Sequence, residues 1–257
     1  MVKFYVRMAE LVISVSAMYE ETKQLCKDYL LEDIPCNADI EVCVTTEDIL
    51  REKELLEKSN SEWYSDKYLE NIVVLRQIAR QLSKFHRVFF HGSAIAVDGE
   101  VYLFTAPSGT GKSTHTRLWK QHLGEHAVMV NDDKPIIQMK TDGNIIVYGT
   151  PWDGKHRLSN NIGLPLKGIC ILSQAKENKI RRISKEDGFG RIYLQTYHVK
   201  RDTNNVATTL KVIEGMLKFP LWHLECNVSE EAAKLSYEMM SGKKWNEKVY
   251  EIQGGIL

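Results

Sequence analysis

The sequence predicts a mixed α/β (α+β) fold in which a partly antiparallel sheet carries a glycine-rich loop, with a small α+β lobe before it. Three observations lead to this prediction. Short apolar runs alternate with amphipathic helical patterns, Asp-Gly turns at 98–99 and 142–143 each join two such runs, and the loop "APSGTGKS" at 106–113 lies between an apolar run and a helical pattern. We expect an N-terminal lobe at 1–85, a core at 86–242 and a C-terminal tail at 243–257.

The composition narrows the classes of function. Lysine plus arginine and aspartate plus glutamate number 34 each, so the summed charge gives no long-range attraction for nucleic acid or an anionic membrane. Charges at Lys3, Arg7 and Glu10 interrupt the N-terminal apolar run, and no run reaches the roughly 18 apolar residues of a membrane helix. We therefore expect a globular, cytoplasmic protein that binds neither nucleic acid nor membrane.

The cysteines give no sign of a disulfide framework or a metal site. They are odd in number and scattered, and no CxxC spacing occurs among them. We expect reduced and mostly buried thiols at Cys26, Cys36, Cys43, Cys170 and Cys226.

The N-terminal lobe mixes strand and helix patterns. The runs "KFYV", "ELVISVS" and "IEVCVTT" read as strands, and residues 18–33 read as a helix. The clearest helix spans 65–84, and we expect it to pack the first lobe onto the core. Its predicted apolar stripe consists of Tyr68, Ile72, Leu75, Ala79 and Leu82.

The core is predicted to begin with two hairpins. Asp98-Gly99 joins the two strands of "SAIAVDGEVYLFTA", and Asp142-Gly143 joins those of "PIIQMKTDGNIIVYGT", because Asp-Gly supplies the positive φ that tight hairpins favour. Later elements follow from apolar periodicity and from cap residues. They are a strand at 168–172, helices near 184–197 and 203–218, a strand at 221–226, and a last helix that Asn227 or Ser229 caps and Gly242 ends.

The segment "APSGTGKS" matches the Walker A pattern GxxxxGK[ST], except that Ala106 replaces its first glycine. Glycines let backbone N–H groups close on phosphate oxygens, Lys112 can reach the β- and γ-phosphates, and Ser113 can ligate Mg²⁺. We therefore expect ATP, or another nucleoside triphosphate, and Mg²⁺ as cofactors. The predicted phosphate-binding residues are Ser108, Gly109, Thr110, Gly111, Lys112, Ser113 and Thr114.

Two adjacent carboxylates follow the predicted strand "AVMVN". A carboxylate at such a strand end holds Mg²⁺ in phosphate-loop enzymes, and a second one can accept the proton of an attacking hydroxyl. Asp132 and Asp133 could therefore divide the metal and base roles. An exposed Asn-Asp-Asp turn is the alternative reading of the same residues.

The order of these motifs resembles the HPr kinase/phosphorylase family, a branch of the phosphoenolpyruvate-carboxykinase-like fold. That family's kinase core runs from His-Gly through a hairpin, a phosphate loop, a helix and a strand to paired aspartates. The matching segments here are "HGSAIAVDG", "APSGTGKST" and "VMVNDDKPII", within residues 90–175. The family's arginine- and glycine-rich phosphorolysis signature has no good match between 156 and 200, so we expect a divergent kinase with an acceptor other than HPr.

The resemblance implies a P-loop kinase core and roles for individual residues. It assigns Asp132 as the base and Asp133, with Ser113, to the metal, and it places His91 near the γ-phosphate and the base. Lys112 is the third expected catalytic residue. The implied reaction transfers the γ-phosphoryl group of ATP to a hydroxyl of a protein, a peptide or a small molecule, and the sequence does not say which.

A polar loop at 148–161 lies between two apolar strands, which is typical of binding loops. Lys155 and Arg157 could clamp phosphate, and Trp152 could close the site or fill a local gap. Two alternatives to the kinase stay open: a regulator that binds nucleotide without turnover, and an ATPase of the parallel-sheet class. The Asp98-Gly99 hairpin argues against the second, and a homo-oligomer is compatible with the sequence.

Overall fold

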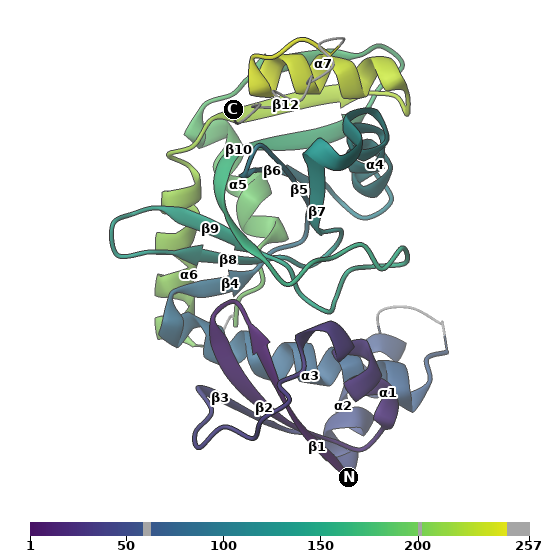
Figure 1. Cartoon of the computed structure of the whole chain (residues 1–257), viewed down its shortest axis with the longest axis vertical. Helices are drawn as coiled ribbons and strands as arrows, with labels where there is room; N and C mark the ends of the chain where they lie inside the picture. The colour runs from purple at the N-terminus through teal and green to yellow at the C-terminus, as the bar shows by residue number, and fades with distance from the viewer. Residues whose placement is uncertain (59–62, 200–201, 246–257) are drawn as a thin grey trace, which may run out of the picture.

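The computed structural model describes residues 1–58, 63–199 and 202–245, and within them it contains two sheets and seven α-helices (Figure 1). The mixed α/β class predicted from the sequence is confirmed. In the described part of the chain no helix has both the length and the apolarity needed to cross a membrane. The expected tail at 243–257 lies mostly outside the described residues, which end at residue 245.

The smaller sheet is formed by the N-terminal strands. Strand β1 (Val2–Met8) pairs antiparallel with β2 (Leu11–Ala17), and the two residues between them, Ala9 and Glu10, both have positive φ. Strand β3 (Ile40–Cys43) joins β2 in parallel. Helices α1 (Glu20–Leu25), α2 (Thr46–Glu57) and α3 (Asp66–Leu82) accompany this sheet. In Figure 1, α3 lies between the small sheet and the rest of the molecule.

One expectation for the N-terminal part was wrong, and one helix was missed. The helix expected at 18–33 ends at Leu25, apart from a short 3-10 turn at Lys27–Tyr29, because the chain then extends to pair Leu30 with Val6. Helix α2 was not expected at all, although Thr45 and Asp48 form a capping box at its start.

The apolar stripe expected on α3 is only partly buried. Ala79 and Leu82 belong to the core, but Tyr68 is 50% exposed, and Ile72 and Leu75 are half-buried. The buried face contains instead Leu69, Val73, Val74 and Ile78. The helix has two apolar faces, and the face buried in the core is the one that is directed toward both sheets.

The larger sheet has nine strands, and its main path runs β4-β8-β9-β10-β6-β5-β7. Strand β12 pairs with β10, and β11 pairs with β12, which completes the sheet. The bounds are β4 (Arg87–Phe89), β5 (Ser93–Val97), β6 (Glu100–Thr105), β7 (Ala127–Asn131), β8 (Ile136–Met139), β9 (Ile145–Tyr148), β10 (Gly163–Gln174), β11 (Lys179–Arg182) and β12 (Leu221–Cys226).

Both expected hairpins are present: β5 pairs antiparallel with β6, and β8 pairs antiparallel with β9. On its other side β6 pairs in parallel with β10, which also pairs in parallel with β12. Strand β7 pairs antiparallel with β5 and therefore runs in the same direction as β6. The loop strand thus has one antiparallel and one parallel neighbour.

Helices cover both faces of the larger sheet. On β6, Tyr102 and Phe104 pack toward α4 (Lys112–Leu123) and α7 (Glu230–Ser241). The alternate residues Val101 and Leu103 pack toward α5 (Lys185–Gln195) and α6 (Thr203–Met216). Ser229 caps α7 and Gly242 ends it with a φ of +73°, as expected.

This topology decides where polar groups gather. The carboxyl ends of β6 and β7 and the amino end of β5 meet at one edge of the sheet, because β5 runs against its two neighbours. The segments that leave this edge are the loop at 106–111, the turn that begins at Asp132, and His91-Gly92.

Candidate functional site

The glycine-rich loop leaves β6 and enters α4 at Lys112, two residues before Thr114, where the helix was expected to start. Gly109 and Gly111 have φ values of +78° and +109°, a region that side chains with a Cβ rarely adopt. Thr110 Oγ1 donates to the Pro107 carbonyl at 2.8 Å and tightens the turn. Among the described residues no side chain caps the first turn of α4, so its N–H groups face the loop and can bind an anion.

Lys112 folds back over its own loop. Its Nζ donates to the carbonyl oxygens of Ala106 at 2.9 Å and Pro107 at 3.2 Å, and the residue is buried. Burial lowers its pKa, and the nearby carboxylates of Asp133 and Asp132 oppose that effect. The ammonium group therefore lies inside the loop, where phosphate oxygens can replace the carbonyl contacts.

Asp132 lies deep in the site, on the side of the phosphate loop. It is 3% exposed, and its Oδ1 accepts a hydrogen bond from Ser93 Oγ at 2.6 Å. Burial raises the pKa of Asp132, while hydrogen bonds from Ser93 and Ser113 lower it. The Asp132 carboxylate and the Ser113 hydroxyl are thus adjacent oxygen donors, of the kind that Mg²⁺ binds.

Asp133 faces a different set of partners. Its Oδ1 lies 3.6 Å from His91 Nε2 and 2.9 Å from Lys134 Nζ, and its side chain is 34% exposed. The other ring nitrogen of His91, Nδ1, lies 2.6 Å from Oε1 of Gln195, the last residue of α5. An amide oxygen accepts only, so Nδ1 carries the proton, and Nε2 of the neutral ring is free to accept one.

The His91 ring is neutral at pH 7. Burial lowers its pKa, and the positive charges of Lys134 and Lys112 lower it further. Asp133 and the hydrogen bond to Gln195 act in the opposite direction. The neutral ring can therefore accept a proton at Nε2, at the mouth of the site.

Asn131 fixes the turn that carries both carboxylates. Its Nδ2 donates to the Thr150 carbonyl at 2.9 Å, and its Oδ1 accepts from the backbone N–H of Asp133 at 2.9 Å and of Lys134 at 2.7 Å. Asn131 was assigned no role from the sequence, although an Asn at the start of a turn is a known signal for such bonds. Ser93 and Gln195 were also missed.

The loop at 149–162 closes over this turn. A Cβ on Gly154 would lie 3.4 Å from the Asp133 Cβ, which shows how closely the loop passes the carboxylate. Lys155 and His156 line the same cavity of about 430 Å³ as His91 and the phosphate loop. Arg157 points away from this cavity: it lies 3.6 Å from Asp153 and lines a neighbouring cleft. The structure thus brings only one of the two expected clamp residues to the loop.

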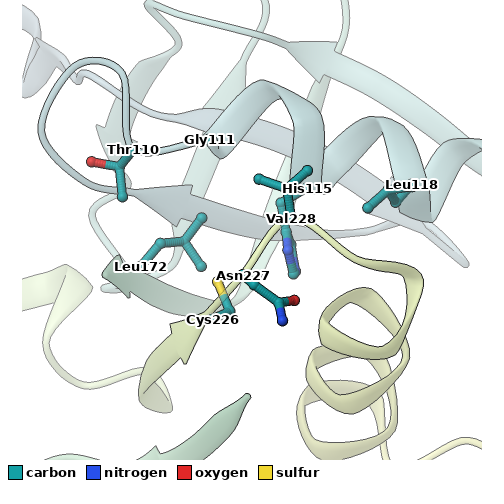
Figure 2. A pocket seen from close by; sticks show the side chains of 8 residues that line it. All are labelled: Thr110, Gly111, His115, Leu118, Leu172, Cys226, Asn227 and Val228. Atoms are coloured by element: carbon teal, nitrogen blue, oxygen red, sulfur yellow. The ribbon is translucent and has the colours of Figure 1, made fainter. Parts of the chain in front are cut away.

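A hollow behind the phosphate loop is too small for a nucleobase. Figure 2 shows it between Gly111, His115 and the segment 226–228, and its volume is about 10 Å³, which is room for one water molecule. His115 is buried there with Nε2 2.7 Å from Ser236 Oγ, and burial lowers its pKa to about 4. His115 is therefore a neutral packing residue, and a nucleobase would have to lie outside this hollow.

The cysteine expectation holds in the described residues. All five thiols are free, and those of Cys26, Cys170 and Cys226 are buried. No group of three or more His, Cys, Asp or Glu side chains in residues 1–58, 63–199 and 202–245 is placed to hold a metal ion. A cation bound by Ser113 and an aspartate would therefore need further oxygen ligands from elsewhere, such as phosphate or water.

Comparisons with known proteins give limited information. No family model matches the chain, and no curated protein sequence matches it. Among solved structures, the chain is similar to an HPr(Ser) kinase/phosphatase from Coxiella burnetii, with 10% identity and a TM-score of 0.35 over 60% of this chain and 93% of that one. This is a distant relationship at most, so function must be argued from the geometry of the site.

Proposed function

We propose that the protein is a Mg²⁺-dependent phosphotransferase that moves the γ-phosphoryl group of ATP to an alcohol hydroxyl, with a kinase core of the P-loop type at 86–242. One observation carries the proposal. The phosphate loop, His91 and two carboxylates with separate surroundings converge on one cavity of about 430 Å³. A protein that only bound nucleotide would need one carboxylate for a metal and no second one beside a histidine.

The surroundings of the two carboxylates favour a division of roles opposite to that expected from the sequence. Asp132 is buried beside Ser113, so we assign it to the cation. Asp133 faces His91 and the open cleft, so we assign it as the base. When bound, Mg²⁺ would neutralise charge on the β- and γ-phosphates.

The chain's own groups then support an in-line transfer. The loop N–H groups and Lys112 hold the phosphates, and Lys155, which lines the same cavity, offers a further positive charge. The acceptor oxygen forms a bond to the γ-phosphorus as the bond to the β–γ bridging oxygen breaks, and that electron pair leaves with ADP. The hydroxyl proton passes to Asp133, and the neutral His91 can receive it in turn.

The test is phosphotransfer by the purified protein. The protein is incubated with ATP, Mg²⁺ and a cell extract, and phosphorylated peptides and small molecules are identified by mass spectrometry. We expect products that appear with wild type and are absent with Lys112→Ala. ATP binding with no transferred phosphate would favour the regulator, and ADP formation that no acceptor stimulates would favour the ATPase.

A further inference from the structure

A large cleft opens beside Asp133, between α3 and the loop at 149–162. Its volume is about 770 Å³, within the range of sites that enclose a sizeable ligand. The apolar and aromatic part of its lining consists of Leu25, Tyr68, Ile72, Leu75, Trp152 and Tyr197. The apolar α3 residues that are not buried in the core, Tyr68, Ile72 and Leu75, therefore form one wall of this cleft.

The aromatic wall is fixed in place without a ligand. Trp152 Nε1 donates to the Asn71 carbonyl on α3 at 3.0 Å. The ring also packs edge-on against Phe89, with 5.8 Å between the ring centroids. Because Trp152 is held from two sides, the cleft presents a preformed apolar surface rather than one that must be ordered on binding.

The cleft is one compartment of a longer groove. It shares Ser108, Asp133 and Lys155 with the phosphate cavity. On its other side it shares Leu75, Lys134 and Tyr197 with a third cavity of about 230 Å³. That third cavity is lined by Phe89, Phe90, His91, Leu194, Gln195 and Thr196 as well. The His91–Asp133 pair thus lies where the three compartments meet.

Apolar side chains are exposed at both ends of this groove. Leu194, at the end of α5, is 77% exposed, and Tyr68, on α3, is 50% exposed. Exposed apolar residues are unremarkable singly, but these two line connected cavities: Tyr68 lines the cleft that Asp133 borders, and Leu194 lines the cavity that His91 borders. The arrangement suits an acceptor that extends past the reacting hydroxyl in both directions.

We propose, on the basis of the phosphotransferase function above, that the acceptor is an extended peptide segment whose serine or threonine lies at Asp133 and is flanked by apolar residues. An extended chain advances about 3.3 Å per residue and points successive side chains to opposite sides, so its neighbours can enter separate compartments. A compact alcohol would occupy one compartment and leave the other apolar surface exposed.

The experiment measures kcat/KM for short serine peptides with leucine or phenylalanine on both sides of the serine, against the same peptides with asparagine there. We expect the apolar peptides to react about tenfold faster or more, which is the range for filling or leaving an apolar pocket. Leu194→Asp should remove most of that preference. Leu55→Asp is the matched control, because Leu55 is 55% exposed on α2 and lies outside the groove.

Equal rates for the two peptide sets, or transfer only to a folded protein or to a small alcohol, would overturn the peptide proposal and leave the kinase intact. Nucleotide affinity, measured by calorimetry in the same samples, separates the two levels. No ATP binding by the wild type would overturn the phosphotransferase proposal itself, and the peptide proposal with it. Leu194→Asp should leave nucleotide affinity unchanged, because Leu194 does not line the phosphate cavity.

Discussion

The two sides of the candidate site are built in different ways. On the phosphate side, eight consecutive residues at 106–113 provide the loop, two positive-φ glycines and a lysine that contacts loop carbonyls. On the side of the cleft, side chains come from α3, the turn after β7, the loop at 149–162 and the end of α5. A local backbone motif can bind any triphosphate, whereas choice of an acceptor depends on how distant segments assemble.

The paired aspartates mark the boundary between these sides. They are adjacent in sequence, yet Asp132 is 3% exposed with Ser93 and Ser113 as partners, and the Asp133 side chain is 34% exposed with His91 and Lys134 nearby. The turn after β7 directs the two carboxylates toward different partners, so one serves each side. The predictions below test this division, from the largest effect to the smallest.

Loss of the loop lysine should disable the phosphate side completely. For Lys112→Ala we expect transfer to fall by about 10⁴-fold or more, because the charge that stabilises the transferred phosphoryl group is removed. Initial rates with labelled ATP provide the measurement. Lys167→Ala is the control, since Lys167 pairs with Glu100 on the surface and should leave the rate unchanged.

Substitutions of the two aspartates should change different kinetic properties. We expect Asp133→Asn to lower kcat by about 10³-fold with nucleotide affinity retained, because the proton acceptor is lost. Asp132→Asn should instead raise the Mg²⁺ concentration needed for half-maximal rate. Titrations of rate against Mg²⁺ distinguish them, and the opposite pattern would restore the assignment that the sequence suggested.

Gln195 should set the protonation of His91. In Gln195→Glu a carboxylate faces Nδ1, so the imidazolium is stabilised and the pKa of His91 rises from its lowered value. His91 is then protonated at a higher pH than in the wild type, so the acid limb of the kcat/KM profile moves to higher pH. Below the raised pKa, kcat/KM should fall about tenfold for each pH unit. A purely structural role for Gln195 would change the rate without moving the limb. Gln81→Glu, on α3 outside the groove, should change neither.

A substitution at Glu70, which anchors α1 to α3, should lower the stability of the protein without changing its nucleotide affinity. The Glu70 carboxylate is fully buried and accepts hydrogen bonds from the Met18 and Tyr19 N–H groups and from Thr22 Oγ1. Glu70→Gln turns one acceptor oxygen into a donor, so we expect about 1–3 kcal/mol less unfolding free energy in urea. The exposed Glu54→Gln should be within about 0.5 kcal/mol of wild type. A matching loss of nucleotide affinity in Glu70→Gln would argue against separate sides.

The sequence predicted local features better than assembled ones. Both hairpins, the glycine-rich loop before α4, the cap at Ser229 and the turn with the two aspartates depend on a few consecutive residues, and the structure contains each of them. Helix α2 was missed despite its Thr45–Asp48 capping box, because most of its residues are polar or charged. The roles of the site residues remain predictions.

What the sequence could not predict requires contacts between distant segments. Gln195 contacts His91 although the two residues are 104 positions apart in the chain, and no local sequence pattern predicts that contact. The buried face of α3 was assigned wrongly for a related reason. A helix with two apolar faces has a stripe that sequence periodicity can detect, but which face is covered depends on where the sheets lie.

Strand β10 connects the two halves of the larger sheet, and this affects how its amide protons exchange with solvent. Its first residues bond to β9, and its remaining ones bond to β6 and β12, so twelve residues tie the two halves of the nine-stranded sheet together. Neither half can separate without breaking bonds on this strand. The amide protons of Ile169, Cys170 and Ile171 should therefore exchange with deuterium only when the whole core opens, whereas those of the loop at 149–162 should exchange through small local fluctuations.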